Sequence, residues 1–315
     1  MFKRIVVGAE ESPEGRDAVA LGAAIADVTG CGLTLLGAFT PYLIASGSEM
    51  DRRTQVRETE RHLQAARRRF APSAHIEAAA ATDPARALLE SAERWHADLI
   101  VIGSSSRAPA GHCAIGRTGR SLLEARPPAL AIAARGLSER GAQLSTIAVG
   151  FDGGAESGRA LEFADLLAAA ADAQLLIRTV NRDPTPRLLH SDLLTSEFRH
   201  ELHDGVEHDA LMLAEQGAAK TAARSSAEAS IGEPSVVFRE LSDVVDVIVI
   251  GSRRWGPVAH HILGGVGEAL AAGCGASLII TGPAAEREAS LRESPHGDPR
   301  TTPTPEPDPH GRIVV

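Results

Sequence analysis

The sequence predicts an α/β protein of two similar tandem domains, each a five-stranded parallel open sheet with helices on both faces. The first observation is an internal repeat. The segment RIVVG at 4–8 recurs 142 residues later as TIAVG, and LIVIGS at 99–104 recurs 148 residues later as VIVIGS. Two landmarks in the same order at nearly the same separation indicate a duplication. The second observation is that short apolar runs alternate with longer amphipathic stretches, as in β-α-β units.

The first half contains five apolar runs of strand length. After the first run, Ser12-Pro13 predicts a helix start, because a capping hydroxyl precedes a proline at the first helical position, and Gly30 predicts its end. Asp83-Pro84 opens another helix in the same way. The apolar residues expected to share one face of the first helix are Ala18, Leu21, Ile25 and Val28. The expected strands are Ile5–Gly8, Leu33–Ala38, Ile76–Ala79, Leu99–Ile102 and Leu130–Ala133.

The second half repeats this order, with a short third helix at Pro234–Asp243. Its expected strands are Ile147–Gly150, Leu175–Val180, Ala227–Ser230, Val247–Ile250 and Leu278–Thr281. Both halves are therefore predicted to be flavodoxin-like (Rossmann-like) domains. We expect domain 1 at 1–135, a linker at 136–145, domain 2 at 146–283 and a disordered tail at 284–315, which is rich in polar residues and proline.

Composition narrows the function classes. The net charge is −9, so the charge balance favours neither nucleic acid nor an anionic membrane as a partner. Lysine occurs only at Lys3 and Lys220, which argues against a lysine-based phosphate loop. The three cysteines lie far apart in sequence and imply neither a disulfide framework nor a zinc knuckle. Without a signal-peptide pattern at its start, the sequence is expected to belong to a cytoplasmic protein.

Candidate binding residues follow the first and fourth strands of each half. In an open parallel sheet the ligand crevice lies beyond the carboxyl ends of the strands, where the strand order reverses. A glycine opens the last helix of each half, and its amides could hold phosphate oxygens. The candidates in the first half are Glu10, Gly103, Ser104 and Gly116, and those in the second are Asp152, Gly153, Gly251, Ser252 and Gly264.

These motifs resemble those of the universal stress protein family, and the resemblance covers both halves. Members that bind ATP carry Gly-x-x-Gly, nine residues and Gly-Ser/Thr after the fourth strand, with an acidic residue after the first strand that contacts adenosine. Gly103 and Gly251 match the first glycine, and Gly116 and Gly264 match the third. Asp152 matches the acidic position, and Glu10 is its longer counterpart. The resemblance implies an intramolecular pseudo-dimer, with the last strands of the two halves paired.

The chain departs from the family pattern at four positions. Ser106 and Arg254 replace the second glycine, and Arg117 and Gly265 stand where a hydroxyl residue is expected. A side chain at the second position strains the loop or fills the phosphate volume. Arg254 could block the site or pair with a phosphate, and Gly264-Gly265 still leaves bare amides for an anion.

Other constellations favour ordinary structural roles. His200, Asp204 and His208 would line one helix face, but the charge-rich surroundings favour a solvated surface over a metal site. Cys113, beside His112, is interpreted as a spare surface cysteine. Three further groups are also given structural interpretations. His260-His261 are interpreted as exposed loop histidines, Trp255 as an aromatic that packs against its own domain, and Arg67-Arg68-Arg69 as part of a solvated helix face.

The sequence therefore favours a non-catalytic stress-response protein that binds ATP or another adenine nucleotide in at least one domain. Mg²⁺ would enter only with the nucleotide. The alternative is a degenerate tandem domain that acts as a protein-interaction scaffold without nucleotide binding. The sequence does not determine whether the chain also forms a homodimer. Slow ATP hydrolysis is an additional alternative, although no residue of a catalytic apparatus is identified for it.

Overall fold

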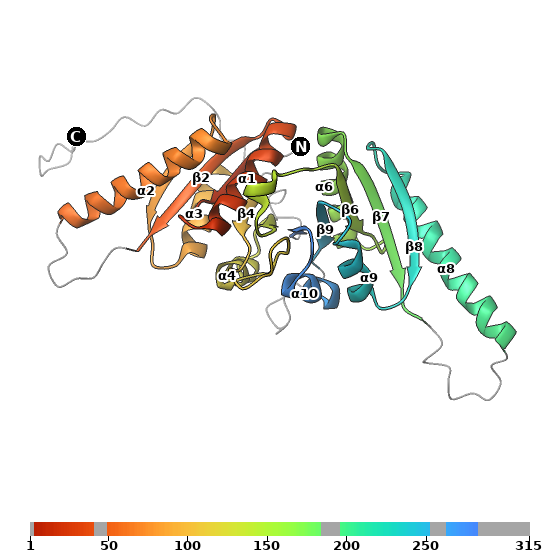
Figure 1. Ribbon diagram of the computed structural model, residues 1–315. Helices are drawn as coiled ribbons and strands as arrows, with labels where there is room; N and C mark the ends of the chain where they lie inside the picture. Colours follow the sequence, from red (N-terminus) through yellow and green to blue (C-terminus); the bar gives the residue numbers. More distant parts are fainter. Residues whose placement is uncertain (1–2, 41–48, 184–195, 253–262, 283–315) are drawn as a thin grey trace, which may run out of the picture. The chain divides into compact units, whose positions relative to one another are not determined.

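The computed structural model describes residues 3–40, 49–183, 196–252 and 263–282. Its first half alternates strands and helices as expected (Figure 1). The elements are β1 (Arg4–Gly8), α1 (Pro13–Thr29), β2 (Gly32–Phe39), α2 (Glu49–Phe70), β3 (His75–Ala80), α3 (Pro84–Trp95), β4 (Leu99–Gly103), α4 (Arg117–Glu124) and β5 (Ala129–Ala133). The expected tail at 284–315 lies outside the described residues.

The second half repeats the order after a short connecting helix, α5 (Leu137–Arg140). Its elements are β6 (Thr146–Gly150), α6 (Ala155–Ala171), β7 (Gln174–Asn181), α8 (Ser196–Ala218), β8 (Ser225–Ile231), α9 (Pro234–Leu241), β9 (Val247–Gly251), α10 (Gly265–Ala272) and β10 (Ser277–Thr281). The short third helix is confirmed as α9, which ends two residues earlier than expected.

Local capping explains where the helices begin. The Ser12 hydroxyl accepts a hydrogen bond from the Gly15 amide at 3.0 Å, Pro13 follows, and Gly30 ends α1 at a left-handed φ of 68°. Asp83 caps α3 in the same way, accepting from the Ala85 amide at 3.0 Å. These starts and the end of α1 are confirmed.

All ten strands form one sheet, in the order β3-β2-β1-β4-β5-β10-β9-β6-β7-β8. Within each half the pairs are parallel, and the halves join where β5 and β10 pair antiparallel, with Leu278 opposite Ile132. The expected pairing of the last strands is confirmed, so the two halves are an intramolecular pseudo-dimer. The pairing covers two strand edges that would otherwise be open to aggregation.

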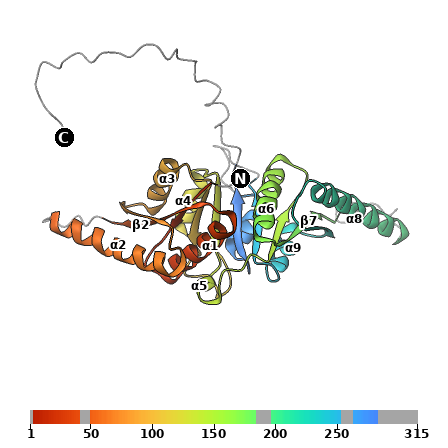
Figure 2. The same cartoon turned by 90° about the horizontal axis from the view of Figure 1, so that it is seen from above.

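Helices cover both faces of this sheet. The first face carries α1, α2, α6 and α8, which bury Leu21, Leu63, Leu167 and Ala214. The opposite face carries α3, α4, α9 and α10, which bury Leu88, Leu122, Phe238 and Leu270. Where the halves meet, α1 contacts α6 (Figures 1 and 2).

One of the four apolar residues expected to share a face of α1 is not buried. Ala18, Leu21 and Ile25 are buried on α1, but Val28 is 37% exposed because the helix is about to end at Gly30. Across the described ranges, none of the helices combines the length and apolar character needed to cross a bilayer.

Candidate functional site

Each half has a cavity at the carboxyl ends of its first and fourth strands. There the strand order reverses, between β1 and β4 in the first half and between β6 and β9 in the second. The first cavity has a volume of about 240 Å³ and is lined by residues that include Glu10, Gly103, Ser104 and Gly116. The second has about 420 Å³ and is lined by residues that include Asp152, Gly251, Gly264 and Gly265. Eight of the sequence candidates thus meet in two cavities.

The other candidates lie elsewhere. Ser106 is exposed and lines neither cavity, and the same holds for Gly153. Ser252 is buried and donates its amide to the Thr281 carbonyl at 3.2 Å, away from the cavity lining. Arg254 lies outside the described residues, as do Trp255 and His260-His261.

The first motif glycine serves packing. A Cβ on Gly103 would lie 2.3 Å from the Glu14 carbonyl oxygen, and one on Gly251 would lie 2.4 Å from that of Glu156. The first turns of α1 and α6 press against the ends of β4 and β9, so no side chain fits at these positions. These two glycines are therefore required by the fold whether or not a ligand binds.

The third motif glycine of the first half, Gly116, shows no such close packing. Gly116 and Gly264 are the N-caps of α4 and α10, with extended backbone that any residue adopts and no side-chain cap bond. A Cβ on Gly116 would meet its nearest neighbour, Ser105, only at 3.9 Å, and one on Gly265, the residue after Gly264, would meet no atom of the described residues within 4 Å. Their missing side chains leave the first amides of two helices open, and such amides attract anions.

The acidic candidates differ in their surroundings. Asp152 is exposed, and its Oδ1 accepts hydrogen bonds from the Gly154 amide at 2.9 Å and the Ser157 hydroxyl at 2.5 Å. This carboxylate therefore orders the first turn of α6, which has glycine at its N-cap. In the first half Ser12 caps α1, so the side chain of Glu10 is left at the cavity without that task.

Sequence reasoning missed the arginines of the second cavity. Arg178 on β7 pairs with Glu228 at 2.6 Å and donates to the Ser230 hydroxyl at 2.8 Å, while its buried Nε has no hydrogen-bond partner. Arg182 also lines the cavity and pairs with Glu233 at 3.1 Å. A cation within a run of apolar strand residues was the available signal, since a buried charge needs a reason.

One arginine lines the first cavity, at the start of α4. Arg117 is the first residue of α4, exposed and without a hydrogen bond or ion pair to the described residues. A cation next to the positive end of a helix is unfavourable, and an anion placed between them would relieve it. Ser104 also lines this cavity, and its hydroxyl accepts a hydrogen bond from the Ala114 amide at 2.9 Å.

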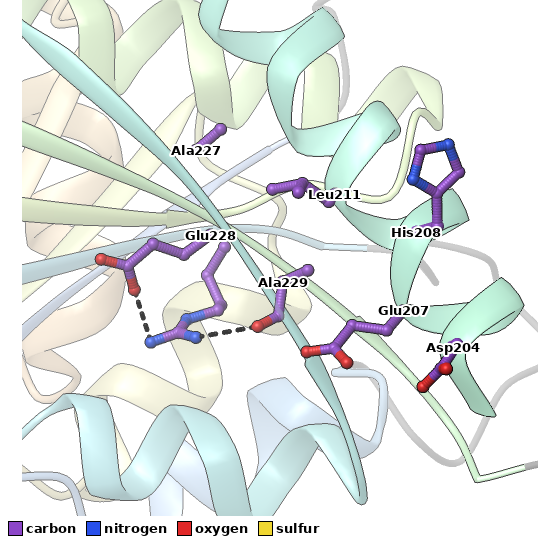
Figure 3. Close-up of a pocket in the computed structure, with 8 residues that line it drawn as sticks. Asp204, Glu207, His208, Leu211, Ala227, Glu228 and Ala229 are labelled. Carbon is purple, nitrogen blue, oxygen red and sulfur yellow. Dashed lines mark hydrogen bonds and ion pairs between the residues drawn. The ribbon is translucent and has the colours of Figure 1, made fainter. Parts of the chain in front are cut away.

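A larger hollow of about 540 Å³ lies away from these motifs, between α8 and the edge strand β8 (Figure 3). Asp204, Glu207 and His208 line it from α8, as Figure 3 shows, and Glu228, which pairs with Arg178 at 2.6 Å, lines it from β8. Asp204 and His208 are exposed, as expected for a solvated face, and His200 does not line this hollow. Within the described ranges no three His, Cys, Asp or Glu residues form a metal-binding group.

The expectation for Cys113 is wrong. Its side chain is fully buried, because Cys113 and Ile115 pack against the end of the second half, while His112 beside them and Ala114 between them stay partly exposed. The Cys113 amide donates to the Cys274 carbonyl at 2.8 Å, and the Ile115 amide donates to that of Ala271 at 2.8 Å.

Two Rossmann-like halves, each with a cavity where its strand order reverses, define a duplicated α/β protein. The family model of the universal stress protein family matches residues 1–130 and 144–281. The chain belongs to the universal stress protein family.

Solved structures agree with this fold. A universal stress protein from Archaeoglobus fulgidus DSM 4304 is 15% identical, with 88% of this chain and 96% of that chain covered and a TM-score of 0.60. A functionally unknown protein from Pseudomonas aeruginosa PAO1 is 15% identical, with 93% and 98% covered and a TM-score of 0.60. A universal stress protein in complex with cAMP is 26% identical, with 44% and 96% covered and a TM-score of 0.33. No curated protein matches the chain.

Proposed function

We propose that this chain is a stress-response protein that binds ATP, or another adenine nucleotide, in the cavity of its second half and does not turn it over. The cavity volumes support this choice of half. Sites for small molecules and cofactors usually measure about 300–1,000 Å³. The second cavity, at about 420 Å³, falls within that range, and the first, at about 240 Å³, falls below it.

One observation carries the proposal. No side chain caps the start of α10, a Cβ on Gly265 would meet no atom of the described residues within 4 Å, and Arg178 and Arg182 also line this cavity. Amides and guanidinium groups are the donors that hold phosphate oxygens. The apolar side chains of Val180, Phe238 and Ile250 line the same cavity and would contact the nucleoside. Asp152 would lie at the adenosine end, as the family resemblance implies.

Mg²⁺ is proposed only as the companion of the nucleotide phosphates. The described residues contain no group of three or more metal-binding side chains that would hold the ion alone. Asp152 is the candidate carboxylate at the cavity, and its Oδ1 already accepts two hydrogen bonds. We expect Mg²⁺ without nucleotide to give no thermal shift.

Calorimetric titration with ATP tests the proposal, with Gly265→Glu as the variant. No atom of the described residues lies within 4 Å of the added Cβ, and the added carboxylate would repel phosphate. Like-charge contacts cost several kcal/mol, so we expect ATP affinity to fall at least about 10-fold. Gly205→Glu on α8, where a Cβ also meets no atom within 4 Å, should leave affinity unchanged. No heat and no thermal shift at saturating ATP would refute nucleotide binding.

The alternative, a scaffold that has lost nucleotide binding, is favoured by the first half. Its cavity is the smaller one, and Arg117 occupies the hydroxyl position of the motif. If neither half binds nucleotide, this alternative holds. Steady phosphate release from ATP that Asp152→Ala abolishes would contradict the non-catalytic proposal.

A further inference from the structure

Two of the three cysteines meet where the halves join. Cys113 precedes α4 and Cys274 follows α10, 161 residues away. Their backbones form an isolated antiparallel bridge, in which the Cys113 amide donates to the Cys274 carbonyl at 2.8 Å and the Cys274 amide donates to the Cys113 carbonyl at 3.0 Å. The two Sγ atoms are 3.2 Å apart, and both side chains are fully buried.

This backbone geometry suits a covalent bond. Residues that exchange both hydrogen bonds across antiparallel strands have Cα atoms about 5.5 Å apart. Disulfides join Cα atoms about 4.4–6.8 Å apart, with sulfurs about 2.05 Å apart. Closing the distance from 3.2 Å therefore needs a movement of the sulfurs of about 1 Å, which side-chain rotation can supply without separating the halves.

We propose that Cys113 and Cys274 form a redox-sensitive pair that oxidises to a disulfide linking the two halves. The oxidant is a small disulfide such as oxidised glutathione. One cysteine thiolate attacks a glutathione sulfur, the glutathione S–S bond breaks, and the first glutathione thiol leaves. The second cysteine thiolate then attacks the protein sulfur of the mixed disulfide and releases the second glutathione thiol. Two cysteine sulfurs are oxidised, one glutathione disulfide is reduced, and both protons pass to the released thiols.

Burial sets the rate of this reaction. The hydrogen bond with Cys274 and burial raise the pKa of the Cys113 thiol well above its usual value. The thiolate is the nucleophile, so the raised pKa makes the Cys113 thiol a slow nucleophile at neutral pH, and its reaction becomes faster as pH rises. The reagent must also reach a fully buried bridge, which requires a local opening between the segments around Cys113 and Cys274. Half-buried Cys31 is expected to react first.

The disulfide would link the two halves covalently. Cys113 lies three residues before the N-cap of α4, and the Cys274 segment follows α10 directly, so the disulfide would tie together the segments that flank both phosphate-facing helices. It would also close a loop of 161 residues, which restricts the unfolded chain. We expect the oxidised protein to melt about 5 °C or more above the reduced protein.

The test uses the full chain, incubated with oxidised glutathione at about pH 8.5, where thiolates form. After alkylation in denaturant, trypsin should release the peptide 108–117 linked to the peptide 255–287, a species that reduction separates. Cys31→Ser should form the same link, and Cys274→Ala should form none. The link is measured on the unmodified sequence, so a folding defect in Cys274→Ala does not affect the result.

Two outcomes would overturn the proposal. In one, Cys31 carries glutathione while Cys113 and Cys274 are recovered as alkylated thiols, which shows that the oxidant was active and the pair did not oxidise. In the other, each of the two cysteines carries its own glutathione, which shows that the second exchange step does not occur.

Discussion

Arg178 occupies in the second half the sheet position that Leu36 occupies in the first. Arg178 lies opposite Gly150 in the β6–β7 register, and Leu36 lies opposite Gly8 in the β1–β2 register. Both side chains line the cavity of their half. At this one sheet position the duplicated fold therefore presents an apolar side chain to the smaller cavity and a cation to the larger one.

Replacing Arg178 by Leu should weaken ATP binding about 10-fold, because a hydrogen bond to a charged group contributes about 1.5–3 kcal/mol. The substitution also removes the ion pair with Glu228 at 2.6 Å and the hydrogen bond to the Ser230 hydroxyl at 2.8 Å, so we expect a loss of stability beside the loss of affinity. Calorimetry and urea unfolding measure the two effects. Arg86→Leu, at an exposed ion pair on α3, is the control. Unchanged affinity for Arg178→Leu would rule out a phosphate contact.

Replacing Gly251 and Gly265 by alanine should change the free energy of unfolding by different amounts. In Gly251→Ala the new Cβ meets the Glu156 carbonyl at 2.4 Å, and such overpacking costs about 1–3 kcal/mol or more. In Gly265→Ala the Cβ meets no atom of the described residues within 4 Å at the start of a helix, so stability should be unchanged or rise by up to about 1 kcal/mol. Urea unfolding of both variants tests the pair. Equal effects would contradict the packing role assigned to Gly251.

Asp17 should be a main stabiliser of the junction between the halves. Its side chain is 1% exposed and accepts the amides of Gly136 at 2.7 Å and Ser138 at 2.8 Å. Asp17→Ala leaves both amides without their acceptor and should cost about 2–4 kcal/mol. Asp27→Ala, exposed on the same helix, should change the free energy of unfolding by less than about 0.5 kcal/mol. A change below about 0.5 kcal/mol for Asp17→Ala would show that water replaces the carboxylate as the acceptor of the two amides.

Glu77 should make stability depend on acid pH. Burial alone would raise the pKa of its carboxyl, but hydrogen bonds from Trp95, Ser91 and Arg94 on α3 outweigh it and lower the pKa. A lowered folded-state pKa adds stability above the unfolded value of about 4.3, and that stability is lost as pH falls through the folded value.

Glu77→Gln should therefore be less stable than the unmodified protein at neutral pH, and the difference should shrink as pH falls below about 4. Denaturant unfolding across pH measures it. Glu90→Gln, at an exposed ion pair on α3, is the control. A difference that stays constant down to pH 3 would mean that the carboxylate charge is not involved.

Much of this fold followed from local pattern. The strands reflect apolar runs, and the caps at Ser12 and Asp83 reflect short-range hydrogen bonds within a few residues. The pairing of the last strands followed from the family resemblance. The roles of individual glycines did not follow, because Gly103 and Gly116 look alike in sequence while only Gly103 faces another helix backbone.

By itself the sequence determined the duplication, the ten strands and the position of both cavities at the strand ends, because periodicity and chain order fix them. Only the tertiary structure decided which side chains enter the cavities and that Cys113 meets Cys274 across the halves. Those contacts join segments separated by many residues, so their distances depend on how the helices and both halves pack rather than on any local pattern.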